Sequence, residues 1–284
     1  MNRVQETLMK FAGQASYILH DYFELTSAYF NKDSEISDNH RYILKQLPIS
    51  CQLTSESSLI LVGNVRMWDN EMLLRSIMEG TVKFIYLSLG SNEERERKLT
   101  EFWEVLPTIS EIKRTKRAKE LINGLPKPLT NDMGFIKEVI LDNETIEELE
   151  RKFPRKLRKE IEHKWSYSEI VKELSKHPLY SNLQGLFHGY GIGSQLIHQD
   201  ADAINLLIDH NSRATERREA KELAHGCRQI SDIITFAAMR YFAYSKLHNE
   251  NIEKLFLESF DKLNYEMESY HKLFREVEDK HRSL

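Results

Sequence analysis

Polar residues recur at helical spacing between residues 194 and 209. Ser194, His198 and Asp202, followed by Asn205 and Asp209, are separated by 4, 4, 3 and 4 positions. This spacing places their side chains on one face of a helix. Asp202 would orient the imidazole of His198, which could then act as a general acid or base. The same pattern also fits the solvated outer face of an amphipathic helix, and both interpretations are open.

A second polar series lies in the most apolar part of the chain. Glu71, Arg75 and Glu79 are four positions apart and are surrounded by leucine, isoleucine and phenylalanine. A buried guanidinium without a counter-charge is costly. Arg75 therefore needs a partner, which could be Glu79, Asp202 or the phosphate of a ligand. We expect the two series to face each other inside a helical bundle; a structural ion pair that joins two helices is the alternative.

Complete catalytic and metal-binding motifs are missing from the sequence. The order Ser194, His198, Asp202 resembles a hydrolase triad, but the serine lacks a Gly-x-Ser-x-Gly elbow and an evident oxyanion hole. Neither His-Glu-x-x-His nor Cys-x2-Cys occurs, so we predict no metal and no other cofactor. The glycines at 185, 189, 191 and 193 do not complete a dinucleotide loop. They predict a flexible joint or a close helix contact instead.

The overall charge excludes a strong general attraction to polyanions. The formal net charge is −4, with 30% charged and 40% apolar residues, as in an ordinary globular protein. No global positive field pulls the chain onto nucleic acid or acidic lipid. Two basic stretches, residues 113–119 and 151–164, could contact RNA phosphates. The acidic residues around them favour a solvated face.

Cysteine content and hydropathy suit a protein of the cytoplasm. Two cysteines cannot build a disulfide framework and are expected to be reduced. Residues 58–90 are the most apolar, but charges such as Arg66 and Lys83 interrupt them, which argues against a membrane span. The first residues lack the pattern of a signal peptide. We therefore predict a cytoplasmic location and no membrane partner.

Helical periodicity runs through most of the chain. Apolar residues recur at three and four positions in residues 3–30, in residues 216–245 and after Asn251. Residues 58–88 are apolar on most sides, as in a central helix. No proline follows Pro178, which favours long C-terminal helices, and alternating β-branched runs are scarce. The sequence predicts an all-α fold, a multi-helix bundle.

Charged residues are unevenly distributed along the chain. Residues 91–164 are rich in both signs and predict a charged peripheral helical insertion in one α-helical domain spanning residues 1–284. A domain boundary near residue 165 is the alternative. Residues 165–212 carry few charges and are expected to be largely buried, so that polar side chains among them would need partners.

Two short motifs carry a resemblance to a known group of proteins. Arg75-x3-Glu79 and, about a hundred residues later, Tyr190-x3-Ser194-x3-His198 resemble an uncharacterised bacterial all-helical family, a domain of unknown function. The resemblance covers roughly residues 55–245. Some such families lie beside phage-defence and toxin genes and are similar to the higher-eukaryote and prokaryote nucleotide-binding (HEPN) superfamily. The resemblance to this superfamily implies a metal-independent ribonuclease that acts on RNA or a nucleotide.

The HEPN superfamily carries an arginine followed by a histidine after four to six residues. Arg218 and His225 fit this spacing and lie in a strongly periodic, proline-free helix. The resemblance implies that His225 takes a proton from the RNA 2′-hydroxyl while Arg218 stabilises the phosphorane. His225 also adjoins a buried apolar stripe, so a satisfied interior histidine is the alternative. Two further pairs share the spacing: Arg158 with His163 and Arg275 with His281.

Two functions of different classes follow from these patterns. In the first, the chain is a helical effector of the defence or toxin type, directed at RNA or a nucleotide. In the second, it is a non-enzymatic helical binding or regulatory module whose polar series hold the fold, and its partner is the product of a neighbouring gene. The long amphipathic C-terminal helices are also compatible with a homodimer.

Overall fold

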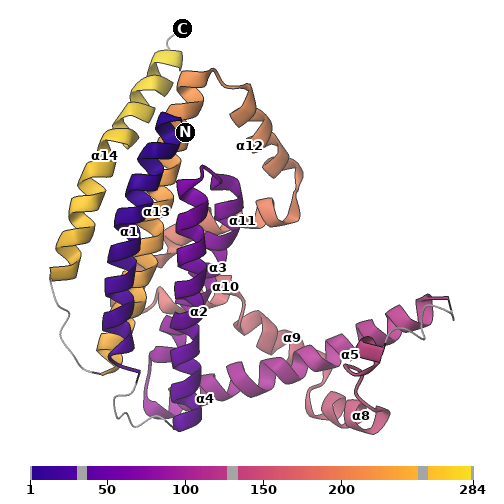
Figure 1. The fold of residues 1–284 in the computed structure, drawn as a ribbon. Helices are drawn as coiled ribbons and strands as arrows, with labels where there is room; N and C mark the ends of the chain where they lie inside the picture. Colours follow the sequence, from indigo (N-terminus) through magenta and orange to yellow (C-terminus); the bar gives the residue numbers. More distant parts are fainter. Residues whose placement is uncertain (1, 31–36, 127–133, 249–254, 283–284) are drawn as a thin grey trace. The chain divides into compact units, whose positions relative to one another are not determined.

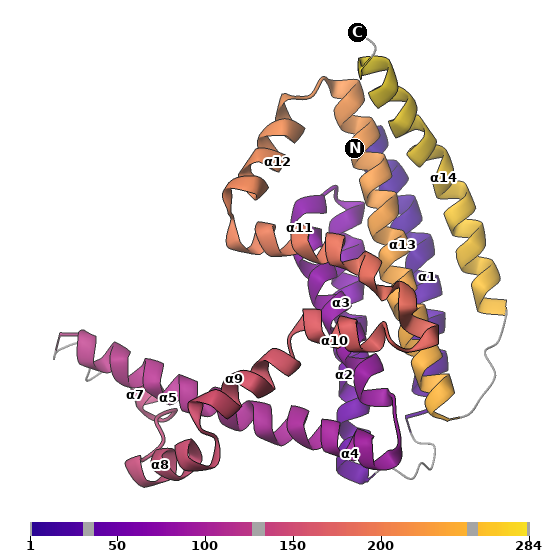
Figure 2. The same ribbon diagram turned by 180° about the vertical axis from the view of Figure 1, so that it is seen from behind.

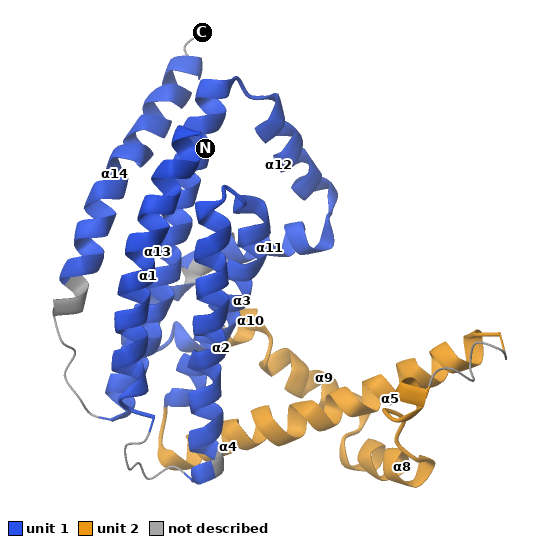
Figure 3. Ribbon diagram, viewed as in Figure 1, with its two compact units in different colours: residues 1–89, 171–284 blue, residues 90–170 orange. Residues whose placement is uncertain are grey.

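The fold is helical throughout. The computed structural model describes residues 2–30, 37–126, 134–248 and 255–282, and within these ranges the chain forms helices and turns and no strand (Figures 1 and 2). The predicted all-α multi-helix bundle is confirmed. The chain divides into two compact units, residues 1–89 with 171–284 and residues 90–170 (Figure 3).

A bundle of long helices forms the first unit. α13 packs against α1, α2, α3 and α14, and in both ribbon views it runs beside α1 (Figures 1 and 2). The bounds of these helices are α1 Arg3–Ser27, α2 Asp38–Gly63, α3 Met67–Ser88, α13 Thr215–Leu247 and α14 Leu255–Arg282. The predicted helices at 3–30 and 216–245 are confirmed, as is a helix after Asn251, from Leu255 onward; residues 249–254 lie outside the described part.

The core of this unit forms where the apolar stripes of α1, α3 and α13 meet. Leu19 of α1, Phe84 of α3 and Ile230 of α13 are fully buried. Burying a side chain of this size contributes about 1.5–3 kcal/mol. The period of 3.6 residues on each helix turns these positions toward the same interior.

The prediction of one long helix over residues 58–88 was wrong. α2 ends at Gly63 and α3 begins at Met67, and between them Val65 adopts a left-handed conformation with φ of 59°. The Val65 N–H donates to the Val62 carbonyl at 2.9 Å, which closes the turn. The reversal lets the apolar residues on both sides of the break pack against each other, since α2 and α3 are in extensive contact.

Four shorter helices precede α13 in the chain and carry the glycine-rich segment. They are α10 Tyr167–Leu174, the 3-10 helix η2 Pro178–Gly185, α11 Leu186–His198 and α12 Ala201–Ser212. A Cβ at Gly193 would lie 2.9 Å from the Glu71 carbonyl oxygen and 3.0 Å from the Cβ of Arg75. Gly193 therefore allows the close contact of α11 with α3, which is one of the two predicted roles of these glycines. The glycines at 189, 191 and 193 lie inside α11 and form no joint ahead of it.

The second unit, residues 90–170, contains the charged region that the sequence marks as an insertion. Its helices are α4 Asn92–Thr100, the π-helix η1 Glu101–Val105, α5 Leu106–Gly124, α7 Gly134–Lys137, α8 Asn143–Lys152 and α9 Arg155–Lys164. Ile112, Ile146 and Phe153 form a small core. A Ser91–Glu94 capping box starts α4.

The basic stretches of this unit are paired with acidic groups of the same unit. Lys113 pairs with Glu162, and Lys116 pairs with Glu150. Arg158 also reaches Glu150, at 3.3 Å. Because the basic side chains are neutralised by acidic groups of the same unit, these pairs favour a solvated surface and argue against an open phosphate-binding surface.

None of the helices in the described ranges combines the length and the apolar character of a transmembrane segment.

Two glycines test the contact between α1 and α13. A Cβ at Gly226 of α13 would lie 2.6 Å from Cδ2 of the fully buried Leu8 of α1, whereas a Cβ at the exposed Gly13 of α1 would meet nothing within 4 Å. We expect Gly226→Ala to lower the free energy of unfolding by about 1–3 kcal/mol. The matched Gly13→Ala should raise it by about 0.5–1 kcal/mol, because alanine favours a helix interior. Urea unfolding followed by circular dichroism measures both, and equal effects would contradict this packing.

Candidate functional site

A buried carboxylate joins α3 to α13. Glu71 is only 2% exposed, and its Oε1 accepts hydrogen bonds from His225 Nε2 at 2.7 Å and from Gln229 Nε2 at 2.8 Å. The guanidinium of Arg228 binds the same oxygen. Burial alone would raise the pKa of Glu71, but the hydrogen bond from His225 and the charge of Arg228 hold that pKa below its usual value. Glu71 is therefore an ionised acceptor inside the bundle.

Amide side chains support this carboxylate. Gln229 also donates to the Met67 carbonyl at 2.8 Å and accepts from Asn70 Nδ2 at 3.1 Å. The Ser58 hydroxyl of α2 donates to Asn70 Oδ1. The chain of bonds runs from α2 through α3 to α13 and satisfies polar groups that would otherwise be buried without partners.

His225 is held in one orientation by its bond to Glu71. An ionised carboxylate is only an acceptor, so Nε2 carries the proton and Nδ1 carries the lone pair. Nδ1 has no hydrogen-bond partner among the described residues. Burial lowers the pKa of His225 and outweighs the opposite effect of Glu71. The ring is therefore neutral near pH 7 and available as a base.

Arg228 and Asp232 continue this polar face along α13. Arg228 NH2 lies 3.2 Å from His225 Nε2, and its NH1 donates to Asp232 Oδ2 at 2.5 Å. Burial raises the pKa of Asp232 to about 6, with the charge of Arg228 opposing this change. A base, a cation and a proton donor thus lie within two turns of one helix.

These groups line a cavity that is large enough for a small ligand. Its volume is ≈ 430 Å³, and its walls combine His225, Arg228 and Asp232 of α13 with Gly189 and Ile192 of α11. The glycine lacks a side chain that would fill this space, so the packing of α11 on α3 leaves room beside the charged face of α13.

Arg75 contacts α11 through other residues than predicted. We had predicted that it would face the polar series from Ser194 to Asp209. Arg75 Nε donates to Glu79 Oε1 at 3.1 Å, and its NH2 donates to the Tyr190 hydroxyl at 2.8 Å. The guanidinium also lies 4.4 Å from the centre of the Tyr190 ring. Neither His198 nor Asp202 is among its partners. This geometry favours the structural alternative, an ion pair that holds two helices together.

The predicted single helix carrying Ser194, His198 and Asp202 is wrong. α11 ends at His198, Gln199 adopts φ of 50°, and α12 starts after Asp200, whose side chain caps it. Both His198 and Asp202 are exposed. Asp202 accepts from Gln195 at 3.3 Å and does not contact His198. Residues 165–212 are correspondingly less buried than expected, since α12 buries only Ala203 and His210.

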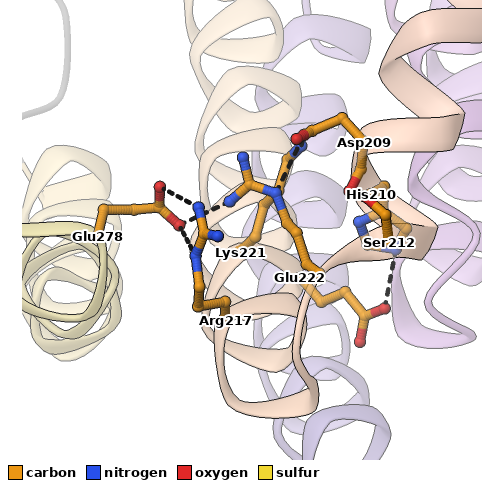
Figure 4. Close-up of polar contacts among 8 residues, drawn as sticks. Asp209, His210, Ser212, Arg217, Lys221, Glu222 and Glu278 are labelled. Atoms are coloured by element: carbon orange, nitrogen blue, oxygen red, sulfur yellow. Dashed lines mark hydrogen bonds and ion pairs between the residues drawn. The ribbon is translucent and has the colours of Figure 1, made fainter. Parts of the chain in front are cut away.

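The end of α12 is tied to α13 and α14 by ion pairs. Asp209 accepts from Lys221 at 3.2 Å and from Arg213 at 3.0 Å. Figure 4 shows Arg217 turned toward Glu278 and His210 beside Glu222. The NH2 of Arg217 lies 2.9 Å from Glu278 Oε2. Asp209, at the C-terminal end of the predicted polar series, therefore takes part in ion pairs that hold helices together.

Arg218 lies apart from His225. Seven residues of helix separate them by roughly 10 Å along the axis, and His225 contacts Glu71 and Arg228 only, among polar groups of the described chain. The charge of Arg218 acts instead on His210 and Glu222. The other two Arg–His pairs, at 158 and 163 and at 275 and 281, show no contact between their members either. No three histidine, cysteine or carboxylate side chains of the described ranges gather as metal ligands.

Comparison with known proteins places the chain in a family. The family of unknown function DUF5677 matches residues 40–215, more than half of the chain. The chain belongs to this family. The matched DUF5677 segment contains Glu71, Arg75 and the α11–α12 region, and it ends at the first residue of α13. No curated protein and no solved structure matches the chain.

The sequence analysis named His225 but not the residues that surround it. Arg228, Gln229 and Asp232 follow His225 at helical spacing on α13. The signal that could have revealed them was a line of polar residues on the otherwise apolar helix α13. Its partner Glu71, 154 positions earlier, was noted only as a neighbour of Arg75.

Asp232 predicts a measurable dependence of stability on pH. Its pKa of about 6 lies above the ordinary value of about 3.9 expected in the unfolded chain. The folded state therefore holds this proton more tightly, and the contribution of Asp232 to stability falls as pH rises from 4 to 7. Asp232→Asn should gain about 1 kcal/mol relative to the wild type over this window, after allowance for a side chain 37% exposed.

Thermal unfolding at pH 4, 5, 6 and 7 measures this difference, expected as a few degrees in Tm. Asp202→Asn, an exposed carboxylate outside the network, is the control. A difference between Asp232→Asn and wild type that stays constant across these pH values would contradict the assignment.

Proposed function

We propose that the protein is a metal-independent ribonuclease, a helical effector of the defence or toxin type. The observation that carries this proposal is the His225–Glu71 pair in the wall of a cavity, with Nδ1 of His225 unengaged and Arg228 beside the ring. A carboxylate that fixes the tautomer of a neutral histidine is the arrangement required of a general base. The effector role rests on the resemblance to HEPN proteins.

The proposed reaction is an internal transfer within RNA. Nδ1 of His225 takes the proton of a 2′-hydroxyl, whose oxygen forms a bond to the adjacent phosphorus while the bond from phosphorus to the 5′-oxygen breaks. Arg228 stabilises the negative charge of the phosphorane. The protonated form of Asp232 gives its proton to the leaving 5′-oxygen. The products are a 2′,3′-cyclic phosphate and a 5′-hydroxyl.

In this proposal Arg228 takes the role that the Arg-x6-His spacing assigned to Arg218. Its guanidinium lies beside the imidazole and lines the same cavity. His198, Ser194 and Asp202 have no part in the step, and Arg75 with Glu79 positions α11 against α3.

The second candidate function is a non-enzymatic binding or regulatory module. The hydrogen bonds of Glu71 favour this second function, because the groups of the network bond to one another. One carboxylate oxygen accepts from three donors of α13, and Arg228 donates to both Glu71 and Asp232. A network of this kind can hold α3 on α13 without any reaction.

RNA cleavage in the presence of EDTA distinguishes the two functions. We expect the purified wild type to cut a labelled single-stranded RNA to fragments with cyclic phosphate ends, at a rate that falls above pH 6 as Asp232 loses its proton. His225→Gln keeps an N–H donor for Glu71 and should lower the rate about 100- to 10,000-fold. Arg228→Lys should lower it less. His20→Gln, an exposed histidine of α1, should cleave like wild type.

Thermal unfolding and growth complete the test. His225→Gln should unfold within a few degrees of wild type, so that loss of cleavage reflects chemistry. Expression of the wild type should slow growth and degrade cellular RNA, and His225→Gln should relieve both effects. Intact RNA and normal growth with wild type and variant alike would reject the ribonuclease and leave the binding module.

A further inference from the structure

A second cavity opens between the α2–α3 turn and the α11–α12 turn. Its volume is ≈ 450 Å³, and it shares no lining residue with the cavity beside His225. The lining is mainly apolar and comes from both turns: Val65, Trp68 and Met72 on one side, Ile197, Ile204 and Leu207 on the other. Ile197 and Ile204 are 45% and 44% exposed, so apolar surface faces the open side of the cavity.

The two turns that shape this cavity are both conformationally unusual. Val65 and Gln199 are the non-glycine residues with positive φ in the described chain, at 59° and 50°, and both line the cavity. A β-branched side chain is strongly disfavoured in this conformation. Strain of this kind is retained where the surrounding structure requires it, often around ligands.

Polar groups at the cavity lie where α3 begins. The indole Nε1 of Trp68 is buried and has no hydrogen-bond partner among the described residues. Arg66 is exposed and precedes the first turn of α3, which has no side-chain cap, while Asp69 in that turn is exposed and lines the same cavity. The guanidinium of Arg66 and the free N–H groups of the helix start favour an anionic group, whereas the Asp69 carboxylate opposes one, so the attraction for an anion depends on Arg66.

We propose that this cavity binds a small amphipathic anion, an apolar chain carrying one carboxylate. The apolar chain contacts Met72, Ile197 and Ile204, and the carboxylate lies at Arg66 beside the start of α3. A volume of ≈ 450 Å³ fits a ligand of this size. This site is independent of any reaction at His225.

Decanoate, below its micelle concentration, is the probe. We expect saturable binding to the full chain by calorimetry, together with a change in tryptophan fluorescence. Trp68→Phe should abolish the fluorescence change and Trp103→Phe should keep it, because Trp103 lies in the other unit. Arg66→Gln should weaken decanoate about tenfold, and decanol should bind wild type more weakly than decanoate does.

A matched pair on α12 tests the location. Ile204→Glu places a carboxylate in the cavity and should abolish decanoate binding, whereas Ile208→Glu, at a 60% exposed position outside the cavity lining, should bind like wild type. Equal loss in both variants, or no saturable binding to wild type, would overturn the site. Equal binding of decanol and decanoate with no effect of Arg66→Gln would overturn the anionic class of ligand.

Discussion

The burial of the Glu71 carboxylate constrains the rest of the first unit. A charge at 2% exposure is tolerable only with several donors in fixed positions. His225, Arg228 and Gln229 supply them from successive positions on one face of α13. A shift of α13 by one residue along α3 would remove these donors together. The carboxylate therefore fixes the register of the two helices with the most buried residues.

The position of α11 follows from that register. Arg75 lies one helical turn after Glu71 and reaches Tyr190 of α11, while Gly193 lets the backbone of α11 approach the Glu71 carbonyl. A larger residue at 193 would push α11 outward and change the width of the cavity beside α13. Polar contacts and one missing side chain thus act together in shaping the candidate site.

Helix periodicity predicts most of the fold because it reports which face of each helix is buried. It predicted α1 and α13 well, and it failed at the breaks between helices. Neither Val65 nor Gln199 is a glycine or proline, so local propensity gives no signal at the two left-handed turns. The continuous polar series from Ser194 to Asp209 was an error of the same origin, since the helix stops at its centre.

The site was only partly predictable for a different reason. His225 and Glu71 are separately visible as polar residues in apolar helices, but their pairing joins positions 154 residues apart and depends on tertiary packing. The choice of Arg218 over Arg228 came from spacing in sequence, whereas the distance from the imidazole decides which guanidinium can act with it.

The start of α3 connects the two cavities through one side chain. Trp68 lines the apolar cavity, and its ring centre lies 5.5 Å from that of His225, which lines the other. The Met67 carbonyl just before it accepts from Gln229, so the Glu71 network also holds this turn in place. A ligand that displaced the indole would have to move the imidazole bonded to Glu71 or the backbone bonded to Gln229. Both are anchored to the same carboxylate, so the network that orients His225 also fixes the position of the turn that carries Trp68.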